Sequence, residues 1–208
     1  MRLDRIGAGC WLLAAPLFLT ANLIVGLAWR RPPFSWATHN ISDLGNVTCG
    51  IWDTTRPRPV CSPWHEAMNV AFVATGVLLA LGVALTWSAL GRATVVKVCV
   101  LAAALGYVLA GAYPADVDEN RHFLAALLIF VPGNAGLLAA ALARRSAALR
   151  PLRPVSLAAG LTGVTGVVLF WAQADPGLGV GGLERVAVLP LLLWAVAVAW
   201  TRPWRALS

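Results

Sequence analysis

Polar residues that could take part in catalysis or binding gather in three short segments of this sequence, each beside a long apolar run. The segments span residues 38–45, 61–69 and 113–122. Together they hold all three histidines of the chain: His39, His65 and His122. Serine, asparagine and carboxylate side chains accompany them. These residue types can bind metal ions, activate water or bind the polar head group of a ligand.

A metal centre is the first chemistry that these residues allow. Zinc takes imidazole nitrogens and carboxylate oxygens as ligands, and a zinc-bound water becomes a nucleophile near neutral pH. The candidate ligands are His39, His65, His122 and Asp116, with Asp43 as an alternative. Such a site would make the protein a metal-dependent membrane hydrolase with zinc as its cofactor. Because the sequence contains neither HExxH nor HxxxH, the histidines also fit an ordinary role as hydrogen-bonding loop residues.

Acyl transfer is the second possible chemistry, since serine, histidine and aspartate can act together as nucleophile, base and orienting acid. The candidate catalytic residues are Ser42, Asp43, His65 and His122. The sequence does not establish the geometry on which such a site depends.

Binding without catalysis needs only polar groups that converge above apolar surface. Ser62 followed by Pro63 predicts a helix start, with the serine as N-cap, and this places His65 and Asn69 one turn apart on one face. The predicted ligand-binding residues are His39, Ser42, Asp43, His65, Asn69, Asp116, His122 and Arg185.

Arg185 has two interpretations. Its guanidinium could bind a phosphate or carboxylate head group. It could equally pair with Glu184, Asp116 or Asp118 and hold the loops together, and the second interpretation is slightly favoured.

The elements that position these residues are membrane-spanning helices. The chain is 59% hydrophobic and 12% charged, whereas a soluble domain is usually about 25% charged. In hydrocarbon, apolar runs of about 20 residues must satisfy their peptide groups internally and are therefore helical. We predict an all-α bundle of six transmembrane helices in a single domain, 1–208, with an outer loop at 30–64. The spans are expected at 6–28, 67–90, 95–113, 123–143, 155–172 and 186–201.

The charges between the spans predict the orientation. With a cytoplasmic N-terminus, the cytoplasmic side carries ten basic residues and Asp4, and the other side carries six basic and eight acidic residues. Positive charge favours the cytoplasmic side, so both termini are expected to be cytoplasmic in a multi-pass protein of the cell membrane. The cytoplasmic basic residues are Arg2, Arg5, Arg92, Lys97, Arg144, Arg145, Arg150, Arg153, Arg202 and Arg205. The net charge of +7 is thereby explained without nucleic-acid binding.

Cys49 and Cys61 lie in the outer loop, on the side of the membrane predicted to be oxidising. Such an environment favours a disulfide between them. The bond would close a short loop and restrict the segment that faces a ligand.

Several short motifs, in order, resemble a known family. They are Ile-Ser-Asp-Leu-Gly at 41–45, Cys-Ser-Pro-Trp-His at 61–65, Gly-Ala-Tyr-Pro-Ala-Asp at 111–116, Pro-Gly-Asn at 132–134 and Gly-Leu-Glu-Arg at 182–185. This arrangement is similar to the bacterial family known as domain of unknown function 998, and the resemblance covers almost the whole chain. The Ser-Asp-Leu-Gly element also resembles the Frag/DRAM-type membrane proteins. The first resemblance implies a six-helix integral membrane protein without an assigned activity.

We therefore expect an integral membrane protein with a polar pocket at the extracytoplasmic face, roofed by the outer loop, that binds or modifies a lipid or other amphiphile. A small transporter is less favoured because the middle of the bilayer holds almost no ionisable residue. An accessory subunit of a membrane complex remains an alternative. The lipid bilayer is the expected surrounding, and the sequence leaves a protein partner or homo-oligomer open.

Overall fold

The computed structural model describes residues 2–200, and six long apolar helices make up most of that part of the chain. Each is long and apolar enough to cross a membrane. This confirms the predicted all-α bundle. The arginines Arg202 and Arg205 lie outside the described residues. The helices are α1 Arg2–Ala28, α2 His65–Leu85, α3 Thr94–Ala112, α4 Glu119–Leu142, α5 Arg153–Trp171 and α6 Gly179–Ala199.

Two helix ends differ from the predicted spans in ways that affect the site. Helix α2 ends at Leu85 rather than near residue 90, because turns follow it. Helix α6 begins at Gly179 rather than near residue 186. Glu184 and Arg185 are therefore helical residues and do not lie in the preceding loop.

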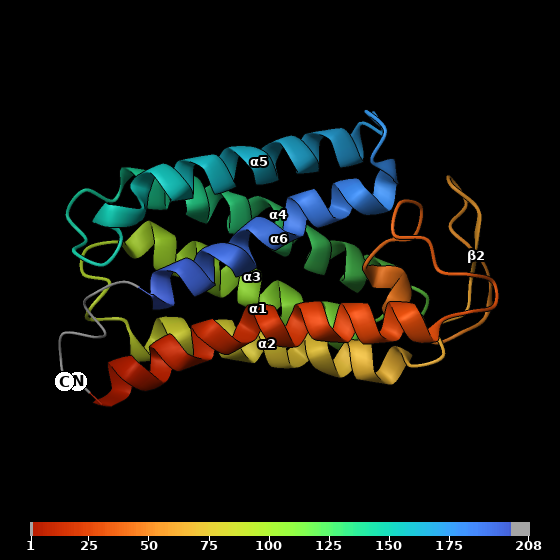
Figure 1. Ribbon diagram of the computed structural model, residues 1–208, viewed down its shortest axis with the longest axis horizontal. Coiled ribbons are helices and arrows are strands. Elements are labelled where there is room, and N and C mark those ends of the chain that lie inside the picture. Colours follow the sequence, from red (N-terminus) through yellow and green to blue (C-terminus); the bar gives the residue numbers. More distant parts are fainter. Residues whose placement is uncertain (1, 201–208) are drawn as a thin grey trace.

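The helices lie side by side along the length of the bundle (Figure 1), and their contacts close into a ring. Each packs against the next in sequence, and α6 returns to pack against α1 and also contacts α4. Small residues allow the close approaches. At Gly166 of α5, a Cβ atom would lie only 2.6 Å from the backbone nitrogen of Ala187 in α6. The last helix is thus held by helices from both ends of the sequence.

Aromatic side chains fill the interior of the ring. Phe18 of α1 contacts Phe72 of α2 and Tyr107 of α3 edge-on, with ring centroids 5.1 and 5.4 Å apart. Trp11 packs beside Trp194 of α6 at 5.7 Å. In a membrane, such packing stabilises a bundle through dispersion rather than through exclusion of water.

The bundle has two different ends. We call the end formed by residues 29–64, 113–118 and 172–178 the hairpin end, and the end formed by residues 86–93 and 143–152 the opposite end. Helix α1 begins and α6 finishes at the opposite end (Figure 1). The hairpin end is covered by one long segment, 29–64, that contains a short helical turn, η1 Ser42–Gly45, and a two-stranded ribbon.

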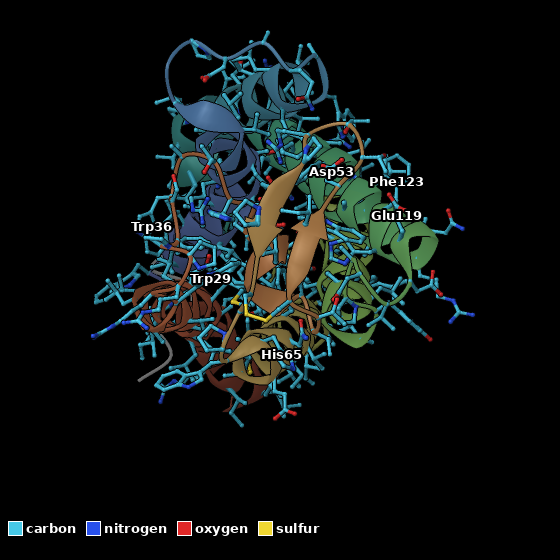
Figure 2. All side chains as sticks on the ribbon, turned by 90° about the vertical axis from the view of Figure 1, so that its right-hand side faces the viewer. Trp29, Trp36, Asp53, His65, Glu119 and Phe123 are labelled. Atoms are coloured by element: carbon cyan, nitrogen blue, oxygen red, sulfur yellow. A yellow bond between two sulfur atoms is a disulfide. The ribbon has the colours of Figure 1, made fainter. Side chains whose placement is uncertain are left out.

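The ribbon consists of β1 Gly50–Trp52 and β2 Arg58–Val60, which pair antiparallel with Ile51 opposite Pro59. A disulfide joins Cys49 and Cys61 at its base, as predicted. Viewed along the bundle, the ribbon lies across the helix ends, with the disulfide on the side of His65 (Figure 2). The covering segment is therefore closed on itself and seated over the interior.

Candidate functional site

The side chain of Asp43, in η1 of the covering segment, is completely buried and binds Arg58 of β2. Arg58 donates from Nε to Asp43 Oδ2 at 2.7 Å and from Nη2 to Asp43 Oδ1 at 2.6 Å. Asp43 Oδ2 also accepts the backbone N–H of Asn40 at 2.8 Å. Charge-assisted, two-point pairing of this kind is the strongest class of side-chain hydrogen bond. Asp43 therefore fixes η1 to the ribbon, and its oxygens are occupied by groups of the same loop.

Asp53, at the tip of the ribbon, extends this ion pair. It receives Arg58 Nη1 at 3.0 Å and the hydroxyl of Thr55 at 2.7 Å. Partial burial raises the pKa of Asp53, but the hydrogen bonds from Thr55 and Arg58 outweigh it and lower the pKa to about 2. Burial likewise lowers the pKa of Arg58, whereas its bonds to Asp43 and Asp53 raise it above the usual value. Asp53 and Arg58 therefore both stay ionised at physiological pH.

Further bonds hold the covering segment to α2. Asn69 of α2 donates to the backbone oxygen of Gly45 at 2.8 Å, and the hydroxyl of Ser62 donates to the backbone oxygen of Leu44 at 2.7 Å. The predicted role of Ser62 as helix cap is wrong: α2 begins later, at His65, with no side-chain cap. The serine is used instead to tie η1 down.

Asp116, in the turn between α3 and α4, binds the same segment from another side. Its Oδ2 accepts the backbone N–H groups of Val47 and Thr48 at 2.9 and 2.7 Å and the Thr48 hydroxyl at 2.7 Å. This carboxylate is thus an anchor for the loop that follows η1.

Helix α6 holds the segment through its first turns. The buried carboxylate of Glu184 accepts the backbone N–H of Ile41, and the backbone N–H of Gly181 donates to Ala37 at 2.8 Å. Gly181 must be glycine here, because a Cβ atom would collide with the carbonyl of His39. The sequence interpretation missed Glu184 as an anchor because it began the last span only at residue 186; in the structure α6 begins at Gly179, and a carboxylate inside an apolar span signals a specific partner.

Arg185 holds the covering segment through backbone carbonyls. Its Nη1 donates to the carbonyls of Trp36 and His39, both at 3.1 Å, and to Gly181 at 2.7 Å. The guanidinium lies over the ring of Trp36, 5.1 Å from its centroid. The expected ion-pair partners were Glu184, Asp116 and Asp118, but among residues 2–200 no carboxylate forms an ion pair with Arg185.

The three histidines occupy separate places. His39 is buried, accepts the Ser35 N–H on Nδ1 at 3.0 Å and therefore carries its hydrogen on Nε2, which donates to Pro59 at 3.0 Å. His65 and His122 each use Nδ1 on a carbonyl, of Ser62 at 3.2 Å and of Tyr113 at 2.8 Å. No group of three His, Cys, Asp or Glu residues in the described chain could hold a metal ion. These residues do not fit a zinc centre, and we do not propose one.

A small enclosed cavity lies beneath η1. Its volume is about 20 Å³, which is enough for about one water molecule. Three polar residues reach it: Ser42, His122 and Glu184. Hydrogen bonds of the described residues do not join Ser42 to either of the other two, and Asp43 is bound to Arg58. The arrangement therefore lacks the nucleophile–base contact that acyl transfer needs.

A larger hollow opens between the first and last helices. We call it the α1–α6 groove; its volume is about 220 Å³. Three leucines form half of its lining, and Arg185 and Trp36 lie at its hairpin end. Its lining is Leu19, Asn22, Leu23, Trp36, Arg185 and Leu189. Of the predicted ligand-binding residues, Arg185 is the one that lines this groove; Ser42 and His122 reach the enclosed cavity instead.

A family model described as "Protein of unknown function (DUF998)" matches residues 12–201. No curated protein and no solved structure matches the chain.

Proposed function

This chain belongs to the DUF998 family of proteins of unknown function, and we propose that it binds an anionic amphiphile in the α1–α6 groove. The family match and the six apolar helices make it an integral membrane protein. The proposal adds a ligand class and a place for it. The head group binds Arg185, and the acyl chain lies on the leucines between α1 and α6.

The observation that carries the proposal is the state of the Arg185 guanidinium. Three carbonyls hold Nη1, whereas Nη2 is buried and has no hydrogen-bond partner among the described residues. No carboxylate of residues 2–200 forms an ion pair with this charge. A buried donor without an acceptor costs about 1–3 kcal/mol, and more when it is charged. A phosphate or carboxylate in the groove compensates the charge, and its oxygens supply the missing acceptor once the guanidinium turns Nη2 toward the groove.

The walls of the groove fit the rest of such a ligand. Leu19 and Leu23 are partly exposed on the surface of α1 that faces lipid, at 37% and 52%. An amphiphile therefore reaches the groove from within the bilayer, without opening the covering segment. Asn22 lies among these leucines and keeps its side-chain N–H on the carbonyl of Phe18.

This proposal changes the roles expected from the sequence. His39, Asp43, Asn69 and Asp116 hold the covering segment in place, so we assign them to the frame of the site. In this proposal His65 does not bind the ligand, and Arg185 alone binds the head group.

We further propose that the hairpin end lies on the side of a bacterial cell membrane that faces away from the cytoplasm. Both termini then lie on the cytoplasmic side. The supporting observation is the distribution of charge. The opposite end carries arginines and almost no acid, whereas the hairpin end carries both signs.

Binding of three single-chain amphiphiles to the purified protein in neutral detergent tests the ligand class. The probes share a twelve-carbon chain and differ in charge: dodecyl phosphate, dodecyl maltoside and dodecyltrimethylammonium. We expect dodecyl phosphate to bind most tightly. The variant Arg185→Gln lacks the charged donor. Its affinity for dodecyl phosphate should therefore be roughly 10- to 100-fold weaker, which corresponds to the free energy of a charge-assisted hydrogen bond.

Two further variants separate binding from folding. Leu19→Trp fills the groove and leaves the hydrogen bonds of Arg185 intact, so it should abolish binding without loss of thermal stability. Leu13→Trp places the same ring on an exposed residue of α1 outside the groove and should bind normally. Equal binding of all three probes, or normal binding by Leu19→Trp, would rule the proposal out.

A further inference from the structure

The opposite end of the bundle carries a second groove, formed where α3 begins and α4 finishes. Two hollows adjoin there and share Arg92, Ala93, Leu142 and Ala143. Their volumes are about 350 and 290 Å³. We call them together the α3–α4 groove. It lies at the other end of the bundle from the α1–α6 groove, and its function does not depend on the function proposed above.

The two hollows differ in chemistry. The first extends along the helices and is lined by apolar side chains, including Val95, Val96 and Leu142. The second lies beyond the end of α4 and is lined by three arginines, Arg92, Arg144 and Arg145. The apolar hollow thus adjoins a hollow lined by three positive charges.

The arginines are available for a ligand. All three are exposed, and within residues 2–200 no acidic side chain forms an ion pair with any of them. Two other basic groups at this end are already engaged. Lys97 donates to the carbonyl of Gly91 at 2.7 Å and lies over the ring of Trp87, and Arg153 donates to the carbonyl of Ala141 at 2.7 Å.

The apolar part of the groove lies at the level of the membrane. Val95 and Leu142 are 63% and 75% exposed, yet they belong to helices that are apolar enough to span the bilayer. Their exposed surface is therefore covered by lipid chains. The arginines follow at the helix ends, where the head groups of the bilayer lie.

We propose that the α3–α4 groove binds one anionic phospholipid of the adjoining leaflet. Its phosphate lies among Arg92, Arg144 and Arg145, and an acyl chain lies along Val95 and Leu142. Arginine matches phosphate oxygens with two parallel donors, which favours it over a lysine at such a site. A zwitterionic phospholipid brings its own positive charge into the pocket and is disfavoured.

Photocrosslinking in lipid nanodiscs tests this directly. The protein is reconstituted with a trace of phosphatidylglycerol or phosphatidylcholine that carries a diazirine in one acyl chain. Crosslinked peptides are then mapped by mass spectrometry. We expect phosphatidylglycerol to label 92–96 and 139–146 at least fivefold more than phosphatidylcholine does. Each arginine near an anionic head group contributes about fivefold in affinity.

Variants distinguish a built site from a general attraction to basic loops. The triple variant Arg92→Gln, Arg144→Gln and Arg145→Gln should reduce this labelling at least tenfold. Arg150→Gln removes the same type of exposed charge at the same end but outside the groove, and should change the labelling by phosphatidylglycerol less than twofold. Arg185→Gln should leave it unchanged, because it acts on the other groove. Equal labelling by both lipids, or equal losses in the triple variant and Arg150→Gln, would refute the inference.

Discussion

The carboxylate of Asp43 and the guanidinium of Arg58 face each other in a two-point ion pair whose side chains are 0% and 8% exposed. The pair joins η1 to β2 and lies at the centre of the segment that covers the bundle. Removing one partner leaves the other charge buried and unpaired, which costs about 3–5 kcal/mol.

Asp43→Asn should therefore lower the free energy of unfolding by about 3–5 kcal/mol, measured by titration with sodium dodecyl sulfate in mixed micelles. Asp118→Asn, which breaks the exposed pair with Arg121, is the matched control and should cost less than about 1 kcal/mol. In Asp43→Leu/Arg58→Met neither charge of the buried pair is left without its partner, so part of the loss should be recovered, although the partly exposed Asp53 also loses its bond to Arg58. Equal losses in the two single variants would contradict the structural role of the buried pair.

The low pKa of Asp53 predicts a pH effect. Its folded-state pKa of about 2 lies below the reference value of 3.8. The stabilisation that its ionised form contributes is therefore complete above about pH 4 and is lost as the pH falls through 2. A ¹³C NMR titration of the carboxyl carbon measures the pKa. Thr55→Val removes one hydrogen bond to Asp53 and should raise the pKa of Asp53, whereas Thr54→Val at the neighbouring position should leave that pKa unchanged.

Loss of the disulfide should loosen the ribbon and leave the helices intact. In Cys49→Ser/Cys61→Ser, we expect amide hydrogen exchange of residues 50–60 to accelerate at least about tenfold, because the reduced loop regains conformational freedom. Exchange in α3 should stay unchanged. Cys10→Ser is the control, since Cys10 is a free thiol in α1. Unaltered exchange of the ribbon would show that the ion pairs suffice to hold it.

Thiol labelling of intact cells tests the proposed orientation. In a background without Cys10 and Cys99, a membrane-impermeant maleimide should react with Thr54→Cys and not with Ala147→Cys. Both positions are exposed, whereas the neighbouring Ser146 is only 2% exposed and would be a poor probe on either side. The reverse pattern would place the hairpin end in the cytoplasm.

The sequence predicted the helices and the disulfide because both depend on local or compositional signals. An apolar run in a membrane must be helical whatever it packs against. Cys49 and Cys61 were the two cysteines expected on one side, which left one natural pairing there.

The contacts of the site were not predictable in the same way. Glu184 meets Ile41, and Asp116 meets Thr48, across long stretches of sequence. Nothing in the spacing of residues indicates which loop group lies against which helix end. Ser62 shows the same limit at short range: its sequence context matches a helix cap, but the carbonyl of Leu44 competes for its hydroxyl and the helix begins later.

The contact between α1 and α6 has a consequence for biosynthesis. One wall of the α1–α6 groove holds Leu19 and Leu23, and the other holds Arg185 and Leu189. At about 5–20 residues per second, the ribosome makes the second wall on the order of 10 s after the first. During that interval α1 is already in the bilayer without its partner. The proposed binding groove is thus the last part of the protein to form, and only a chain translated through α6 has it.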